Sequence, residues 1–158
     1  MPVTSTPIFP QAVVNTGCAL IHGTGLVQFG AASTATGTMS PFFVPGANGA
    51  ILTAITVQCT DTATCTMALI LSTGGAGGTF VQVLGYAAVS GAGTATTYSV
   101  PPVNLLNGTQ GLVASLPYDS CGNRILYVAA GSTLNIGLLS TIIWSTGALY
   151  VAAQGGNL

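Results

Sequence analysis

Residues 50–72 read AILTAITVQCTDTATCTMALILS, and this stretch decides the fold. Its two halves alternate from residue to residue, which places successive side chains on opposite faces of a β-strand. One face, which is mainly apolar, collects Ile51, Thr53, Ile55, Val57, Cys59, Cys65, Met67, Leu69 and Leu71. The opposite, mixed face collects Ala54, Thr56, Gln58, Thr66 and Ala68. The stretch therefore predicts two β-strands, rich in β-branched residues, that bury one shared face.

Two arrangements of these strands agree with the alternation. In a hairpin that turns at residues 60–64, Cys59 lies opposite Cys65 and Val57 lies opposite Met67. A slip by one residue would bury the wrong face, so the pattern fixes that register. In the alternative, residues 60–64 form a corner that carries the chain from one sheet to another. The inward residues are then the same, but the contact between the two cysteines is lost.

The four cysteines are Cys18, Cys59, Cys65 and Cys121. Because we expect no secretory signal, they are interpreted first as thiols made in a reducing compartment and packed in the core or in loops. The hairpin register adds a sharper hypothesis, a disulfide between Cys59 and Cys65. No C-x-x-C pair occurs, so the sequence predicts no zinc site or other metal site.

The rest of the chain extends this pattern into an all-β fold. Eight to ten short strand candidates are separated by turns at intervals near 8–12 residues, which indicates an antiparallel β-sandwich, with a jelly roll as a variant. The length of 158 residues suits one domain, which we place at residues 18–158. Residues 1–17 contain three prolines and predict an extended N-terminal arm. That arm is either a frayed end or a strap anchored on a neighbouring subunit by Ile8 and Phe9.

The charge content is unusually low. A typical soluble domain has about 25 % charged residues, whereas 2 % of this chain is charged and 49 % is hydrophobic. Almost no charge repulsion would keep an isolated monomer apart from its copies, so we infer that much of its surface is covered in the working state. With one basic residue, the chain has no nucleic-acid-binding patch. No run of about 18 apolar residues predicts a membrane helix, and MPVTSTPIFPQ has no signal-like segment.

The residues available for catalysis are few. Apart from the thiols they are His22, Asp61, Asp119 and Arg124, and their sequence context favours turns and strand ends over an acid–base or nucleophilic site. No glycine-rich segment has the spacing of a phosphate-binding loop. We therefore predict that the protein is not an enzyme and has no cofactor.

Aromatic residues offer a different kind of site. Most of them lie in strand candidates, where core packing is their default role. Trp144 and Tyr150 flank the last turn and are candidates for an interface.

Three segments carry a resemblance to a known family: ANGAILTAITVQCTDTATCTMALILS, SVPPVNLLN and LPYDSCGNRILYVAAGSTLNIGLL. The chain from residue 46 onward resembles small β-sandwich proteins of tailed-bacteriophage virions, the head decoration or cement proteins. The resemblance implies a structural virion protein that is synthesised in the host cytoplasm and located on the capsid surface. Its implied partners are the major capsid protein and its own copies, and a homotrimer is the expected oligomer. The motifs are structural, so no site residues carry over.

A binding module outside the cell is the alternative function. Thr-rich segments at residues 35–38, 62–64 and 94–97 could form a flat face that binds glycans or ice. Their spacing is not one regular repeat, and export would require a signal that the sequence does not show.

Overall fold

The computed structural model describes residues 12–15, 19–21, 28–29, 35–36, 39–60, 64–73, 80–91, 102–107, 116–139 and 149–158. This part of the chain is all-β, without a helix. A six-stranded sheet contains β1 (Ala12–Asn15), β12 (Leu149–Asn157), β6 (Ala50–Cys59) and β10 (Leu126–Val128) in that order, with β2 (Ala19–Ile21) on β12 and β9 (Val103–Asn104) on β6. A four-stranded sheet has the order β5 (Met39–Phe43), β11 (Ser132–Leu138), β7 (Cys65–Thr73) and β8 (Phe80–Val89). The short strands β3 (Gln28–Phe29) and β4 (Ala35–Thr36) pair with each other.

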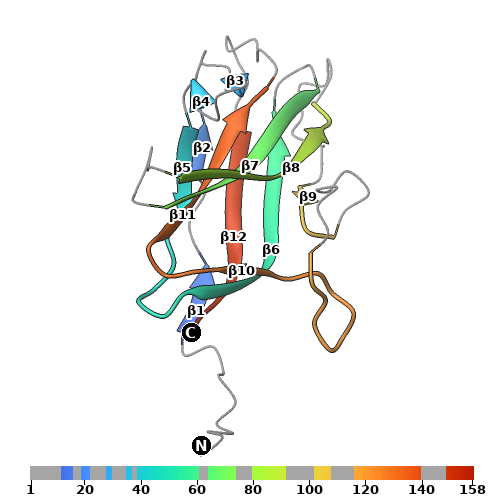
Figure 1. Cartoon of the computed structure of the whole chain (residues 1–158). Coiled ribbons are helices and arrows are strands. Elements are labelled where there is room, and N and C mark those ends of the chain that lie inside the picture. Colours follow the sequence, from blue (N-terminus) through green and yellow to red (C-terminus); the bar gives the residue numbers. More distant parts are fainter. Residues whose placement is uncertain are drawn as a thin grey trace, which may run out of the picture.

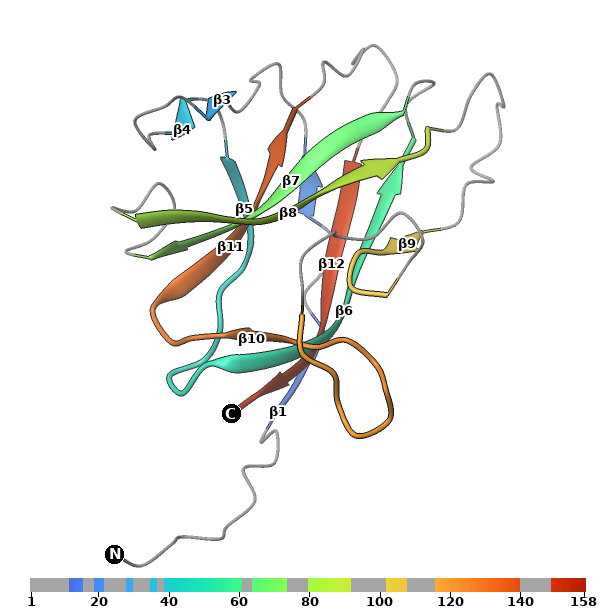
Figure 2. The same ribbon diagram turned by 45° about the vertical axis from the view of Figure 1, so that its right-hand side comes forward.

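The pairs within these sheets are antiparallel, and the two larger sheets form the layers of a sandwich-like fold (Figures 1 and 2). This confirms the all-β antiparallel sandwich, whereas the jelly-roll connection stays a prediction. β6 and β12 are the long central pair of the first layer. One edge of β12 is shared by β2 and β1, and one edge of β6 is shared by β9 and β10.

The stretch at residues 50–72 forms a corner, not a hairpin. β6 belongs to the six-stranded sheet and β7 to the four-stranded sheet, so the expected hairpin register is wrong. The corner alternative is correct, and Cys59 and Cys65, which end β6 and begin β7, are both buried. A hairpin would leave its apolar face to be covered by other strands, whereas the corner lets β6 and β7 cover each other across the roughly 10 Å between sheets.

In the first half of β6 the buried and exposed faces differ from those that strict alternation predicts. Opposite β12 the register shifts between Gln154 and Gly155, which leaves Thr53 as the extra residue of a β-bulge. The bulge reverses the faces on its N-terminal side, so Leu52 is fully buried while Thr53 is exposed. Ile51, expected to face inward, is only half-buried. Strict alternation therefore assigns this half of the strand to the wrong face.

The core lies between the two large sheets. Of the five residues expected to be buried together, Ile55, Val57, Met67 and Leu69 are fully buried, and Leu71 is half-buried against them. Additional buried members, from several strands and from the turn after β9, are Phe43, Leu52, Val89, Leu105, Leu106, Val128, Leu134, Ile136, Leu149 and Val151. Burial of this apolar set on both inner faces provides the main stabilisation of the sandwich.

Part of the outer face of the four-stranded sheet, over β7 and β11, is also buried. Ala68 and Ile70, which point away from the first core, are 0 % exposed and form a second apolar cluster. Beside them the Asn135 Nδ2 atom donates hydrogen bonds to Ser72 Oγ at 2.9 Å and to the Thr133 carbonyl at 3.1 Å. The buried Asn135 Oδ1 atom accepts no hydrogen bond from the described residues. This polar group links β7 and β11 and penalises a slipped register, which would remove its partners.

Part of the N-terminal span that was predicted as an arm forms a strand of the six-stranded sheet. Strand β1 lies inside residues 1–17, the span predicted as an arm, and pairs with the last strand of the chain. Residues 1–11, with Ile8 and Phe9, lie outside the described part of the structure.

Candidate interaction surface

The outer face of the six-stranded sheet is formed by the side chains of β6 and β12 that point away from the core. Tyr150 pairs with Gln58, and Ala152 pairs with Thr56, so these four residues form two adjacent rows. All four are half-buried, between inward neighbours that are fully buried. None of them is charged, which makes this a neutral surface of one ring, one amide, one hydroxyl and one methyl group.

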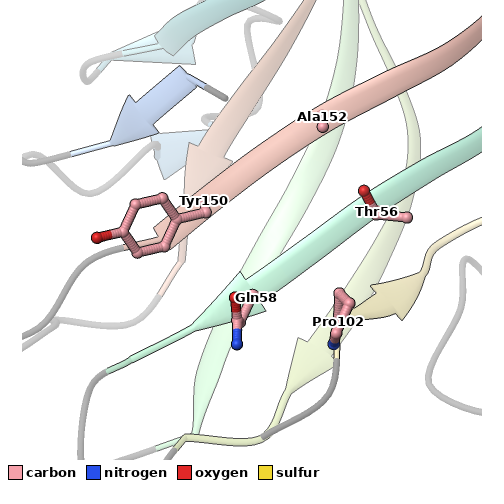
Figure 3. A pocket seen from close by; sticks show the side chains of 5 residues that line it. All are labelled: Thr56, Gln58, Pro102, Tyr150 and Ala152. Atoms are coloured by element: carbon pink, nitrogen blue, oxygen red, sulfur yellow. The ribbon is translucent and has the colours of Figure 1, made fainter. Parts of the chain in front are cut away.

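A shallow hollow lies over these rows. Its lining residues are Thr56, Gln58, Pro102, Tyr150 and Ala152, and its volume is about 220 Å³. In Figure 3 the side chains of Gln58 and Pro102 lie side by side, and the Tyr150 ring extends from the neighbouring strand. The rings of Tyr150 and Pro102 offer apolar contact, while Gln58 and Thr56 offer hydrogen-bonding groups. This composition fits a neutral protein surface better than a charged ligand.

Strand β9 holds Pro102 in this position. Val103 pairs with Val57 and Asn104 pairs with Thr56, so the residue before β9 reaches the edge of β6. The Asn104 Oδ1 atom accepts hydrogen bonds from the Ile55 amide at 3.3 Å and from the Leu106 amide at 3.0 Å. One side chain thereby links β6 to the turn that follows β9, next to the residue that lines the hollow.

A second row on the same sheet has an exposed large side chain at each end. Val13 pairs with Gly156, Gly156 with Ile51, and Ile51 with Tyr127, so the row spans β1, β12, β6 and β10. Val13 is 91 % exposed and Tyr127 is 53 % exposed. Large exposed apolar and aromatic groups in one row are typical of contact surfaces.

Residues 116–125 form a loop that leads into β10 and contains both charged residues of the described chain, and this loop projects from the sandwich at the end where the C-terminus lies (Figure 1). The Asp119 Oδ1 atom accepts hydrogen bonds from the amides of Asn123 at 2.7 Å and Cys121 at 2.9 Å. These bonds, led by the one from the Asn123 backbone, lower the pKa of Asp119 below 3.8. The Arg124 Nε atom donates to the Tyr118 hydroxyl at 3.2 Å, and its guanidinium lies 5.7 Å from the Tyr118 ring centre. These contacts give the charged groups a local structural role.

The described residues contain no group of His, Cys, Asp and Glu side chains that could hold a metal ion. Cys59 and Cys65 are buried and form no disulfide, and Cys121 is an exposed thiol on the projecting loop. The Cys59–Cys65 disulfide hypothesis depended on the hairpin register. That register is absent, because β6 and β7 lie in different sheets.

Several predicted residues lie outside the described part of the structure: Ile8, Phe9, Cys18, His22, Asp61 and Trp144. Most of the Thr-rich segments, at residues 37–38, 62–63 and 94–97, also lie outside it. Of the predicted interface residues the structure therefore describes Tyr150. Alternation identified Thr56 and Gln58 as outward residues, but no local signal linked Pro102 to them.

Comparison with protein-family models, curated proteins and solved structures finds no match to this chain. Among the residues that the structure describes, no helix is long and apolar enough to cross a membrane.

Proposed function

We propose that the protein is a non-enzymatic structural component of a bacteriophage virion, which binds the outer surface of the capsid shell and stabilises it as a homo-oligomer. The three segments that resemble head decoration proteins suggest the virion. The observation that carries the proposal is the neutral exposed face of the six-stranded sheet. Its strands contain no charged residue, and the hollow beside Tyr150 combines aromatic, amide and hydroxyl groups.

Such a face suits a large, permanent protein contact. An isolated protein with so little charge is prone to aggregate, because little charge repulsion separates its copies. Contact of its sheets with a shell and with its own copies would cover the surfaces that aggregate. Charge pairs contribute little to such a contact, because the only charged residues of the described chain interact within their own loop. Binding therefore depends on apolar area and neutral hydrogen bonds.

The test is co-sedimentation of the purified full-length protein with purified capsids of the phage that encodes it. We expect saturable binding with equal occupancy at low and at high salt, since salt screens only charged contacts. Removal of residues 1–11 should lower the occupancy if Ile8 and Phe9 act as a strap. Absence of saturable binding by the wild-type protein would overturn the proposed function.

A pair of tyrosine variants tests the role of the hollow. Tyr150→Ser should lower the occupancy, because it truncates the largest of the side chains that line the hollow. Tyr118→Ser is the matched control, because Tyr118 is exposed on the projecting loop. Equal occupancy of both variants would mean that the shell is bound by another surface.

A further inference from the structure

Strand β8 is a long edge strand. It ends the order β5-β11-β7-β8, and among the described residues it pairs only with β7. Its ten residues, FVQVLGYAAV, contain neither proline nor charge. An edge strand of this kind leaves a row of backbone amide and carbonyl groups able to pair with another strand.

The other sheet edges of the described structure are protected. β5, at the opposite edge of the same sheet, has five residues with Pro41 at its centre, and proline cannot donate a backbone hydrogen bond. In the six-stranded sheet the outer strands β1, β2, β9 and β10 have four, three, two and three residues. Short strands, proline and charged side chains are three of the means by which an edge avoids pairing, and β8 has none of these three.

A β-bulge divides β8 and defines the half that can pair. The register opposite β7 shifts between Leu69 and Ile70, which leaves Leu84 as the extra residue. Beyond it, residues 85–89 pair regularly with β7. In this half Ala87 and Val89 are buried toward the core, whereas Tyr86 and Ala88 are exposed on the other face.

We propose that residues 85–89 of β8 pair antiparallel with the same residues of a second copy across a twofold axis. The register sets Gly85 opposite Val89, Tyr86 opposite Ala88, and Ala87 opposite itself. The two four-stranded sheets then join into one continuous sheet. The inference rests on the self-association in the proposed function, but it requires no capsid.

Two features of β8 favour a second copy of the protein as the source of the strand that pairs with it. A twofold axis brings identical residues close together, so a charged strand would repel its copy, and β8 has no charge. In the stated register each large side chain meets a small one, since Tyr86 faces Ala88 and Val89 faces Gly85. The neighbouring side chains thus fit without two tyrosines in opposition, and the antiparallel backbone groups match by symmetry.

Introducing a positive or a negative charge at Ala88 tests the pairing. In this register the two Ala88 side chains are diagonal neighbours about 7–8 Å apart, so Ala88→Lys and Ala88→Glu each place like charges together. Because Ala88 is exposed, both variants should keep the fold, which circular dichroism checks. We expect sedimentation equilibrium to give each variant half the oligomer mass of the wild type. The dissociation constant of the pairing should rise at least tenfold. An equimolar mixture of the two should restore the wild-type mass.

Thr53→Lys is the matched control, because it adds the same charge at an exposed position of the other sheet and should leave the mass unchanged. A monomeric wild-type protein would overturn the pairing, and so would an odd-numbered oligomer such as the homotrimer that the resemblance implies. So would Ala88 variants that keep the wild-type mass, or a mixture that fails to restore it. Capsid binding by a protein that fails this test would leave the proposed function standing, so the two ideas fail separately.

Discussion

The bulge at Thr53 makes a sharp prediction, because strict alternation and the structure assign opposite faces to two adjacent residues. In the structure Leu52 is 0 % exposed and points into the core. Thr53 is exposed, and its hydroxyl donates a weak hydrogen bond to the Gln154 carbonyl at 3.5 Å. Strict alternation would instead place Thr53 in the core and Leu52 at the surface.

The two variants that separate these assignments are Leu52→Ala and Thr53→Lys. Truncating a fully buried leucine to alanine lowers the free energy of unfolding by about 2–5 kcal/mol. For a chain of this length, that loss corresponds to a melting temperature lower by about 4–20 °C. A lysine at an exposed strand position should change the free energy by at most about 1 kcal/mol. A lysine forced into the core would be far more damaging, since its charge would lose its hydration.

The assay is urea unfolding followed by circular dichroism, with all variants at one protein concentration because self-association shifts apparent stability. Leu69→Ala serves as the positive control, since Leu69 is fully buried on the facing sheet and should lose about 2–5 kcal/mol. The reasoning would be refuted if Thr53→Lys lost more than about 2 kcal/mol while Leu52→Ala lost less than about 0.5 kcal/mol. That outcome would mean that Thr53 faces the core and Leu52 faces the surface, as strict alternation predicts.

Two further predictions concern close contacts of the backbone and the charged loop. In Gly155→Ala the new Cβ atom would collide with the Ile51 carbonyl oxygen and lie 2.8 Å from the Leu52 Cα atom, so we expect a loss of about 1–3 kcal/mol in urea unfolding; an unchanged midpoint would contradict this close approach. Because hydrogen bonds lower the pKa of Asp119 below 3.8, the stabilisation of its loop is complete above pH 3.8 and is lost as pH falls through the lowered pKa. An NMR titration of the Asn123 amide should show a midpoint below 3.8 that is absent in Asp119→Asn, and a midpoint above 3.8 would contradict the prediction.

The all-β class and much of the core could be predicted from the sequence. Alternation in residues 50–72 identified Ile55, Val57, Met67 and Leu69 as inward residues, and all four are fully buried. It also identified Thr56 and Gln58 as outward residues that now line the hollow. These predictions succeeded because the two-residue period of a strand is a local property of the backbone.

Only the tertiary structure decided which strand each face meets. The same inward residues fit a hairpin and a corner equally well, because alternation reports a face and not its partner. The bulge at Thr53 arises where β6 passes Gly155, about one hundred residues further along the chain, so no local pattern predicts it. Likewise Pro102 and Tyr150 line one hollow only because β9 and β12 both lie against β6. Local periodicity therefore determined the strands and most of their faces, whereas pairing between distant segments decided the corner, the bulge and the candidate surface.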